Sequence, residues 1–581
     1  MRARFFAGVL PLALLVVGGP QALAAAPPQG CPADNGGLSL PAGFCASVFA
    51  DHLGHARHLT VGADGTVYVN TWSGDYYTYG HVDRLPRGGF LVALGDTGNA
   101  GRADVIRRFG DGVDQGSAGG TGIALYNNAL YAEVNDRIVR YALTPGTPVP
   151  TGKAAVVVSG LPLTGDHPMH PFVIDAKGNL FVDVGTATNA CDIDNRMPGT
   201  KGHEPCTELL TRGGIWRYDA NRTGQKFSPK ERYATGIRNG EGMDFDEQGR
   251  LFVTQHGRDQ LLENYPKLFS EKTGHELPAE EVFVLESGGD YGWPKCYFDG
   301  LQGKLVLAPE YGGDGGRTIG VCADKRAPVF FFPAHWAPND LLIYKATQFP
   351  KVYRGGAFIA FHGSWNRAPA PQRGYNIVFQ PLAAGRPSGP YIIFADGFAG
   401  PYREPGRALA RPGGLAVGPD GSLYVSEDVH GKIWRITYQG PADAALQSAA
   451  AAPVATGGEH GIDVASLPLP PGATREQVQL GARIFWGESS GGTCSGCHGS
   501  DGKGSTVGPN LTSGQWSWGN GSWQAIAATI DSGVMRPKHA DGAMPPRGGA
   551  PLSDSDVKAV AAFVWSISHQ RQGARAGTTG H

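Results

Sequence analysis

The sequence predicts two folds in one chain: an all-β six-bladed β-propeller, followed by a small all-α domain. One hairpin pattern recurs six times before residue 440. About the last hundred residues show amphipathic helical patterns instead. The 581 residues include 88 glycines and 43 prolines, yet 41% of them are hydrophobic. That composition is typical of a turn-rich globular protein and not of a disordered chain.

Six segments share an apolar residue, a turn with Gly or Asn, and an alternating strand. They begin at residues 61, 125, 173, 244, 353 and 416. The turn residues supply positive φ and the period of two supplies one buried face, so each segment predicts a tight hairpin. Copies spaced by about fifty to a hundred residues indicate six propeller blades. A series of β-sandwiches is the alternative, which the similarity of the hairpins disfavours.

The hairpins are unevenly spaced, which predicts long insertions at 258–282 and 299–340. Such loops tend to carry function on one face of a propeller. The second insertion contains His335 and Trp336, whose place in the fold the sequence does not give.

Residues 1–24 have the pattern of a signal peptide. Two arginines precede an apolar run from Phe5 to Val17, and small residues follow at Ala22 and Ala24. The run is short for a membrane span, although a retained anchor is the alternative. No later segment is apolar enough to cross a bilayer, so the sequence predicts a soluble periplasmic protein.

The charge balance excludes several classes of partner. With 50 Lys+Arg, 52 Asp+Glu and a pI near 6.8, the chain has no basic excess for nucleic acid or a membrane surface. Small molecules and other proteins are the expected partners.

Six of the eight cysteines fall into three sequence-local pairs, as expected in an oxidising compartment. Nearest-neighbour bridges are the simplest prediction, although connectivity does not follow from sequence alone. The predicted pairs are Cys31–Cys45, Cys191–Cys206 and Cys296–Cys322.

The propeller is expected to span residues 31–439, and an Ala-, Pro- and Gly-rich linker 440–472 follows it. Beyond the linker, Thr474, Ser522 and Ser553 each precede an amphipathic helical pattern as an acceptable N-cap. Residues 473–570 therefore read as the small helical domain.

The two remaining cysteines, Cys494 and Cys497, form C-x-x-C followed directly by His498. Covalent haem c attachment requires this pattern, with the two thiols on the vinyl groups and the imidazole on the iron. Met544 is the predicted second axial ligand, and Met535 and His539 are the alternatives. The Met-Pro-Pro loop before a final helix resembles class I cytochromes c, so this region is expected to be a cytochrome c domain.

Four ordered stretches before residue 439 carry a further resemblance: 165–185, 235–259, 288–294 and 411–428. Together they resemble the pyrroloquinoline quinone (PQQ)-dependent soluble glucose dehydrogenase and sorbosone dehydrogenase family, from about Leu40 to Tyr438. The resemblance implies PQQ and calcium as cofactors. A PQQ site needs cationic groups for three carboxylates, a hard cation at the quinone and a base for the substrate hydroxyl.

Asp166 and His167 match the family's Asp-His pair. The resemblance implies that His167 takes the hydroxyl proton as hydride passes from substrate carbon to quinone. It also implies that Asp166 orients the imidazole or contacts the sugar. The alternative is an exposed loop Asp and His before a strand.

Arg238 and Asn239 match the family's cofactor-binding Arg-Asn pair. Gly257 and Arg258 occupy the positions whose backbone carbonyls bind calcium in the family. The glucose enzymes have Gly-Pro there, and Arg258 places a long cation close to the expected metal.

Arg411 matches a further cofactor arginine, whereas a second arginine of the glucose enzymes is replaced by Gly413. The family's cofactor lysine has no clear equivalent, and Arg367 is the predicted replacement. Solvated salt bridging at blade edges is the alternative for any one of these arginines.

The resemblance implies a quinoprotein dehydrogenase that oxidises a sugar, a sorbosone-like aldehyde or a related alcohol and reduces its own haem. An external acceptor, such as a soluble cytochrome, a copper protein or the respiratory chain, would take the electrons. Two alternatives stay open: a binding propeller with an electron-transfer haem and no dehydrogenase activity, and a lactonase-type hydrolase that uses calcium alone.

Overall fold

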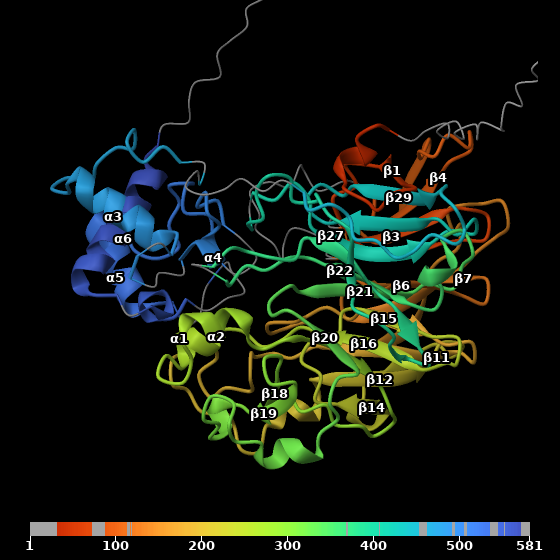
Figure 1. Cartoon of the computed structure of the whole chain (residues 1–581), viewed down its shortest axis with the longest axis horizontal. Coiled ribbons are helices and arrows are strands. Elements are labelled where there is room, and N and C mark those ends of the chain that lie inside the picture. Colours follow the sequence, from red (N-terminus) through yellow and green to blue (C-terminus); the bar gives the residue numbers. More distant parts are fainter. Residues whose placement is uncertain are drawn as a thin grey trace, which may run out of the picture.

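The computed structural model describes residues 32–570, except for 73–87, 113–114, 116, 118, 368–369, 406, 453–459, 461, 488, 491–493, 505–507, 535–537, 539–543 and 551. A β-propeller and a helical domain lie side by side, with the helical domain against one face of the propeller (Figure 1). The predicted signal peptide lies outside the described residues.

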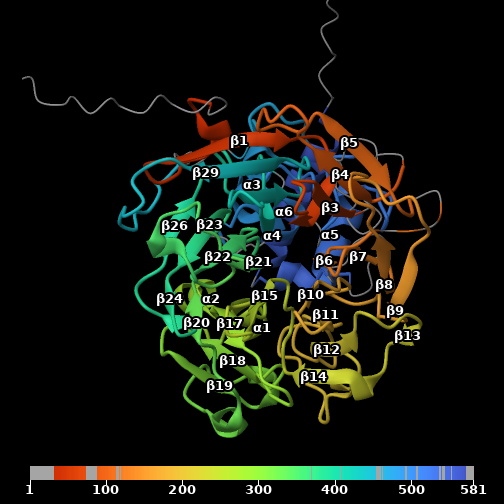
Figure 2. The ribbon, with the colours of Figure 1, turned by 90° about the vertical axis from the view of Figure 1, so that its right-hand side faces the viewer.

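Six four-stranded antiparallel blades form the propeller, as predicted, and they surround a central axis (Figure 2). The first three blades follow one another along the chain, and the short strand β13 (Gln225–Lys226) adds a parallel edge to the second. Their strands are β2 (His55–Val61), β3 (Val67–Trp72), β4 (Leu91–Gly95), β5 (Val105–Phe109); β6 (Ile123–Tyr126), β7 (Ala129–Val134), β8 (Arg137–Ala142), β9 (Ala155–Ser159); β10 (Phe172–Ile174), β11 (Asn179–Val184), β12 (Gly214–Asp219), β14 (Arg232–Thr235).

The last three blades carry two additional small hairpins, β18 (Cys296–Asp299) with β19 (Lys304–Leu307), and β24 (Leu382–Ala383) with β25 (Arg386–Pro387). The blade strands are β15 (Met243–Phe245), β16 (Leu251–Gln255), β17 (Glu280–Val284), β20 (Phe330–Phe332); β21 (Pro338–Ile343), β22 (Ala357–Phe361), β23 (Asn376–Gln380), β26 (Ile392–Ala395); β27 (Pro412–Val417), β28 (Leu423–Glu427), β29 (Ile433–Tyr438), β1 (Phe44–Ala50).

Five of the six predicted hairpins join the first two strands of a blade. The fifth prediction is wrong in detail: the segment from 353 supplies only β22, which pairs with β21 across the connection 344–356. Tyr344, Phe349 and Tyr353 of this connection are buried in the hydrophobic core, which favours a longer packed connection over a tight turn.

The ring is closed by the N-terminal strand. β1 pairs with β29, so that the last blade takes one strand from the start of the domain and three from its end. The Trp434 indole also donates a hydrogen bond to the Gly36 carbonyl at 3.0 Å. The two ends of the propeller therefore hold one another.

The predicted helices of the C-terminal domain are confirmed as α3 (Arg475–Phe485), α5 (Trp523–Ser532) and α6 (Asp554–Ser568). Thr474, Ser522 and Ser553 cap them as expected. A short helix α4 (Cys494–His498) carries the haem-attachment motif. α3 crosses α6 closely, because a Cβ at Gly481 would lie 1.9 Å from the carbonyl oxygen of Ala559.

The described parts of the predicted linker are packed at both ends. Ala449 donates its backbone N–H to the Ile393 carbonyl at 2.8 Å, and Ala452 donates to the Asp396 carboxylate at 3.2 Å. Leu467 is buried in the core of the helical domain. The segment therefore follows the propeller edge before it enters the second domain.

The insertion 258–282 forms α1 (Leu261–Asn264) and α2 (Glu271–Glu276) before it enters β17. These two helices lie beside the helical domain (Figure 1). Among the described residues, no helix is both long and apolar enough to cross a membrane.

Two of the predicted disulfides are confirmed, Cys191–Cys206 and Cys296–Cys322. The third prediction involves Cys31, which lies outside the described residues.

Candidate functional site

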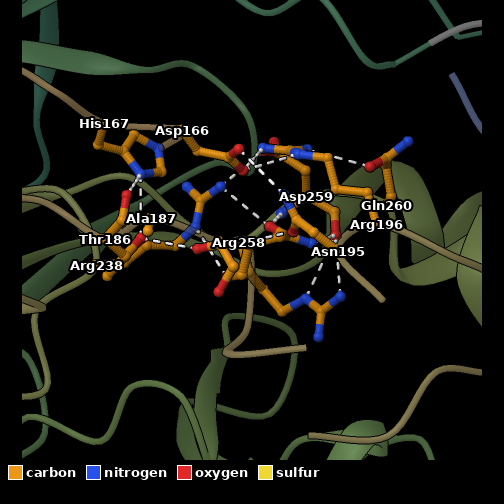
Figure 3. Close-up of polar contacts among 12 residues, drawn as sticks. Asp166, His167, Thr186, Ala187, Asn195, Arg196, Arg238, Arg258, Asp259 and Gln260 are labelled. Carbon is orange, nitrogen blue, oxygen red and sulfur yellow. Dashed lines mark hydrogen bonds and ion pairs between the residues drawn. The ribbon is translucent and has the colours of Figure 1, made fainter. Parts of the chain in front are cut away.

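The side chain of His167 is held by Thr186, which lies two residues after β11. Its Nδ1 lies 3.1 Å from both the carbonyl oxygen and the hydroxyl oxygen of Thr186 (Figure 3). A carbonyl oxygen only accepts, so Nδ1 carries the proton and donates it. Nε2 is therefore the acceptor nitrogen, and it makes no hydrogen bond with any residue that the structure describes.

The His167 imidazole is kept neutral by its surroundings. Burial, followed by the positive charges of Arg238 and Arg196, lowers its pKa well below the usual value. A neutral ring with an open Nε2 is the state required of a general base.

Asp166 does not contact the His167 ring. Its carboxylate pairs with Arg196, whose Nε donates to Oδ2 at 2.9 Å, and accepts from Asn195 at 3.1 Å (Figure 3). Of the two roles expected for Asp166, orienting the imidazole falls to Thr186 in this structure. The carboxylate instead fixes Arg196 beside the base.

Asp259 joins two arginines from different loops. Its Oδ2 accepts from Arg238 Nη2 at 2.9 Å and from Arg196 Nη2 at 3.1 Å. Although burial alone would favour the neutral acid, the guanidinium groups hold the pKa of this carboxyl well below its usual range. Asp166, Arg196, Asp259 and Arg238 thus form one buried ionic network (Figure 3).

Asn239 lies directly behind the base. A Cβ added at Gly185 would be 2.6 Å from the Cβ of His167 and 3.3 Å from Oδ1 of Asn239. That Oδ1 is buried and has no hydrogen-bond partner among the described residues. An unpaired buried acceptor beside a candidate base marks a place where a ligand could supply the missing donor.

Gly257 and Arg258 follow β16 at the same end of the propeller. The Gly257 carbonyl accepts from Arg238 Nη1 at 3.1 Å. The Arg258 side chain is buried in an ion pair with Glu310. Glu310 therefore neutralises the Arg258 guanidinium that was expected near the metal.

The two remaining predicted arginines, Arg411 and Arg367, have different partners. Arg411 donates to the carbonyls of His362 and Gly363 at 3.1 and 2.8 Å, and burial, followed by the charge of Arg411, lowers the pKa of His362. The Arg367 guanidinium is instead engaged by Glu276 and by three backbone carbonyls. It makes no hydrogen bond to the Asp259 network.

Sequence reasoning missed several residues of the site. Burial, with the charge of Arg238 as the next cause, lowers the pKa of His256 to about 3. His362 Nε2 donates to Asp428 Oδ1 at 2.9 Å, and Arg57 donates to the same carboxylate at 2.7 Å. Three of the missed residues lie in stretches that carried the family resemblance: His256 and Asp259 directly after the strand of the fourth predicted hairpin, and Asp428 at the end of the fourth stretch. The missed residues are Arg57, Arg196, His256, Asp259, His362 and Asp428.

The attachment motif lines a cleft. His498 Nδ1 is 2.9 Å from the Pro509 carbonyl, so Nδ1 is the donor and Nε2 carries the lone pair that could bind a metal. Met544 lines the same cleft, together with Cys494 and Cys497. The alternative ligands, Met535 and His539, lie outside the described residues.

The disulfide Cys191–Cys206 closes the loop that supplies Asn195 and Arg196. Replacing both cysteines by serine is expected to lower the free energy of unfolding of the propeller by about 3 kcal/mol, because the loop of 15 residues gains freedom in the unfolded chain. Urea unfolding of the double variant, compared with the wild type, measures this difference. Equal stability would show that the bridge does not restrict the unfolded state.

Two family models match the chain. The model TrAA12-like matches residues 112–439, and the model "Cytochrome C oxidase, cbb3-type, subunit III" matches residues 477–564. A curated relative from Coprinopsis cinerea, a pyrroloquinoline quinone-dependent pyranose dehydrogenase, is 28% identical over 232 residues, which is 35% of this chain and 30% of the relative. The chain spans half or less of the length of the curated relatives it matches.

Solved structures share the propeller fold. The holo form of the pyranose dehydrogenase PQQ domain from Coprinopsis cinerea aligns with a TM-score of 0.53 and 19% identity, covering 69% of this chain and 97% of that one. The calcium structure of the family AA12 enzyme from Trichoderma reesei aligns with a TM-score of 0.54 and 19% identity, covering 70% and 97%. At this identity the likeness establishes the six-bladed fold.

Proposed function

This chain belongs to the TrAA12-like family, and we propose that it is a quinoprotein dehydrogenase that oxidises a sugar, a sorbosone-like aldehyde or a related alcohol. In this proposal the propeller holds PQQ, and the electrons pass to the haem c of the same chain. The observation that carries the proposal is the neutral His167 ring, with Nδ1 tied to Thr186 and Nε2 open.

The charge of the site suits PQQ. Arg411 donates only to backbone carbonyls and forms no ion pair with a described residue, which favours a ligand that carries carboxylates. The unpaired Oδ1 of Asn239 offers an acceptor next to His167. The other guanidinium groups are already paired: Arg196 and Arg238 with Asp166 and Asp259, and Arg57 with Asp428 and Glu241.

Bound PQQ would supply a quinone that accepts two electrons from the substrate. The chain's own residues then have separate tasks. Nε2 of His167 takes the proton of the substrate hydroxyl, while Thr186 keeps the ring in the required tautomer. Arg238 and Asn239 bind the cofactor, and Asp259 holds Arg238 in place.

Calcium is proposed to bind the backbone carbonyls of Gly257 and Arg258. The buried pairing of Arg258 with Glu310 supports this site, because it neutralises the nearby guanidinium. The Gly257 carbonyl now accepts from Arg238, so that metal binding would replace this hydrogen bond. A hard cation suits carbonyl oxygen ligands.

Haem c is proposed to be attached through Cys494 and Cys497, with His498 and Met544 on the iron. Their position around one cleft supports this ligand set. A thioether ligand raises the reduction potential, which suits an acceptor of electrons from the propeller. A periplasmic location, and an external one-electron acceptor such as a soluble cytochrome, a copper protein or the respiratory chain, complete the proposal. The two confirmed disulfides agree with an oxidising compartment.

The test is to load the protein purified without PQQ. Before loading, it should show a cytochrome spectrum and no dehydrogenase activity. Addition of PQQ with Ca²⁺ should restore bleaching of an electron-acceptor dye by one of a panel of sugars, aldehydes and alcohols. A chelator added before PQQ should prevent this. A loaded protein that bleaches the dye with no compound of the panel, or activity that never needs PQQ, would reject the proposal.

The rate of dye bleaching should stay high in mild acid. At pH 6, a histidine with the ordinary pKa of about 6.5 is only about a quarter neutral. Because the pKa of His167 is lowered, its neutral form persists, and activity should fall only as the pH drops through that lower value. The pH profile of the loaded protein measures this. A loss of activity centred near pH 6.5 would contradict the lowered pKa of His167.

A further inference from the structure

The haem cleft is not built by the helical domain alone. Two propeller loops reach it, one through Gln260 and Glu263 at α1 and the other through Trp365 and Asn366 after β22. In Figure 1, α1 and α4 lie at the junction of the two domains. The cleft residues from the helical domain include Cys494, Cys497, His498 and Met544.

Gly496 lies where the helical domain packs closely against the propeller. It lies on α4, and a Cβ there would be 2.6 Å from the carbonyl oxygen of Trp365. Its backbone is helical and not left-handed, so its conformation does not call for glycine. The contact with the propeller does, because no side chain fits between α4 and Trp365.

The position of Gly496 fixes which side of the haem faces the propeller. Cys494 and Cys497 flank it, and thioether bonds hold the vinyl edge of a c-type haem at these two residues. Trp365 therefore faces the covalently attached edge.

Two amide side chains connect this edge to the ionic network around His167. Asn366 Nδ2 donates to Asp259 Oδ1 at 2.8 Å, and Arg196 Nη1 donates to Gln260 Oε1 at 3.1 Å. Both amides line the haem cleft. The network that would hold the quinone and the cleft that would hold the haem thus share two residues.

A second contact lies at the rim of the interface. The propeller residue Glu404 accepts a hydrogen bond from Ser500, two residues beyond His498. His460 lies 4.0 Å from the same carboxylate and stacks on Trp486 with ring centroids 4.0 Å apart. The docked arrangement is therefore held at two separated places.

From these contacts we infer that the haem domain has a dedicated docking site on the propeller, formed by Trp365, Asn366, Gln260 and Glu404. Gly496 is the positioning residue that lets the attached haem edge reach this site. Electrons enter the haem through this contact. The inference rests on the proposed function, since it names where the two cofactors meet.

The electron count fits a single docking site. Oxidation of one substrate molecule releases two electrons and two protons. The haem carries one electron at a time, so each substrate requires two passages through the contact, and a one-electron acceptor in solution removes each electron in turn. The protons go to solvent through His167 and bulk water.

The test uses Gly496→Val in the full chain, with Ser495→Val as the matched control. Both positions are the variable residues of the attachment motif, so both variants keep the thiols and the axial histidine. Ser495 already carries a side chain and is only half-buried. Both variants introduce valine into α4, and they are compared because Gly496 is the position that packs against Trp365.

Three measurements are made on each variant. Small-angle scattering without PQQ should show Gly496→Val as more extended, with the docking constant lowered by about 5- to 150-fold, the range expected for forcing a side chain into a packed contact. With PQQ and Ca²⁺ bound, the rate of haem reduction by substrate should fall by the same factor as the docking constant, provided that most Gly496→Val molecules are undocked. Dye bleaching, which takes electrons directly from the propeller, should keep its wild-type rate. Ser495→Val should match the wild type in all three.

The outcomes separate the inference from the proposed function. If no compound bleaches the dye in the wild type, the proposed function fails. If dye bleaching is normal while Gly496→Val keeps both the compact shape and the wild-type rate of haem reduction, the inference is wrong and the dehydrogenase assignment stands. Should Gly496→Val fail to acquire haem, Glu404→Ala, which removes the Ser500 contact from the propeller side, is expected to extend the protein and slow haem reduction. A compact Glu404→Ala with normal haem reduction would overturn the inference.

Discussion

His167→Ala is expected to slow the reduction of haem by substrate by about 10²–10⁴-fold, the usual contribution of a positioned general base. The open Nε2 of the neutral ring is the acceptor that the variant loses. His167 forms no ion pair with the Asp259 network, so cofactor binding should persist. Stopped-flow absorbance of the haem after mixing with substrate measures the rate.

Met544→Ala provides the contrast to this variant. Without the thioether the haem should lose reduction potential and accept electrons poorly, while substrate still delivers electrons to the propeller at the normal rate. A dye that takes electrons directly from the propeller should therefore rescue Met544→Ala and leave His167→Ala inactive. Rescue of both would show that His167 is not the base.

Asp259→Ala is expected to lower the free energy of unfolding of the propeller by about 3–5 kcal/mol, because it leaves two buried guanidinium groups without their shared carboxylate. It should also abolish substrate-driven haem reduction, since Arg238 loses its fixed position. Urea unfolding followed by tryptophan fluorescence, with the haem spectrum recorded in parallel, separates the propeller from the helical domain.

A surface aspartate is the matched control for Asp259→Ala. Asp420 pairs with Arg435 on the same propeller, and its side chain is 45% exposed. Asp420→Ala should cost no more than about 1 kcal/mol, as exposed ion pairs do. Equal losses in the two variants would contradict the view that the Asp259 network is set apart by its burial.

Most of the fold could be predicted because the periodicity of the sequence reports local structure directly. Period-two alternation around a Gly or Asn turn identified the first two strands of five blades, and Ser or Thr before an amphipathic run identified the three helices. The fifth hairpin could not be placed in this way, since β21 lies upstream of the predicted segment. The 344–356 connection is held by burial of aromatic rings, which has no local period.

The candidate site was predictable only where motif order carried the information. Asp166, His167, Arg238 and Asn239 were identified in this way, and the structure brings them to one end of the propeller. Arg196 was missed, because it lies on a disulfide-closed loop that no motif marks, and its partner is 63 residues away. Distances between loops of different blades are set by the ring as a whole.

Arg367 was predicted as a cofactor ligand from its residue type, and the structure does not place it in the Asp259 network. Its residue type suited a cofactor carboxylate, yet its guanidinium is buried among the carbonyls of His275, Ala334 and Pro371. A single arginine in a sequence does not reveal which acceptors surround it. The neighbouring Trp365 and Asn366, which no motif singled out, reach the haem cleft instead.

Closure of the ring by β1 has a consequence for the order in which this protein matures. Gly36 and Trp434, which meet where the ring closes, are 398 residues apart in the chain. Bringing such distant segments together carries a large loop-closure entropy that only the completed ring repays, so folding of the propeller should be slow. The helical domain needs only contacts within its own short stretch, although it is synthesised last. Haem attachment should therefore be finished on chains whose ring is still open, and pulse-chase refolding should reveal a haem-bearing intermediate with protease-sensitive blades.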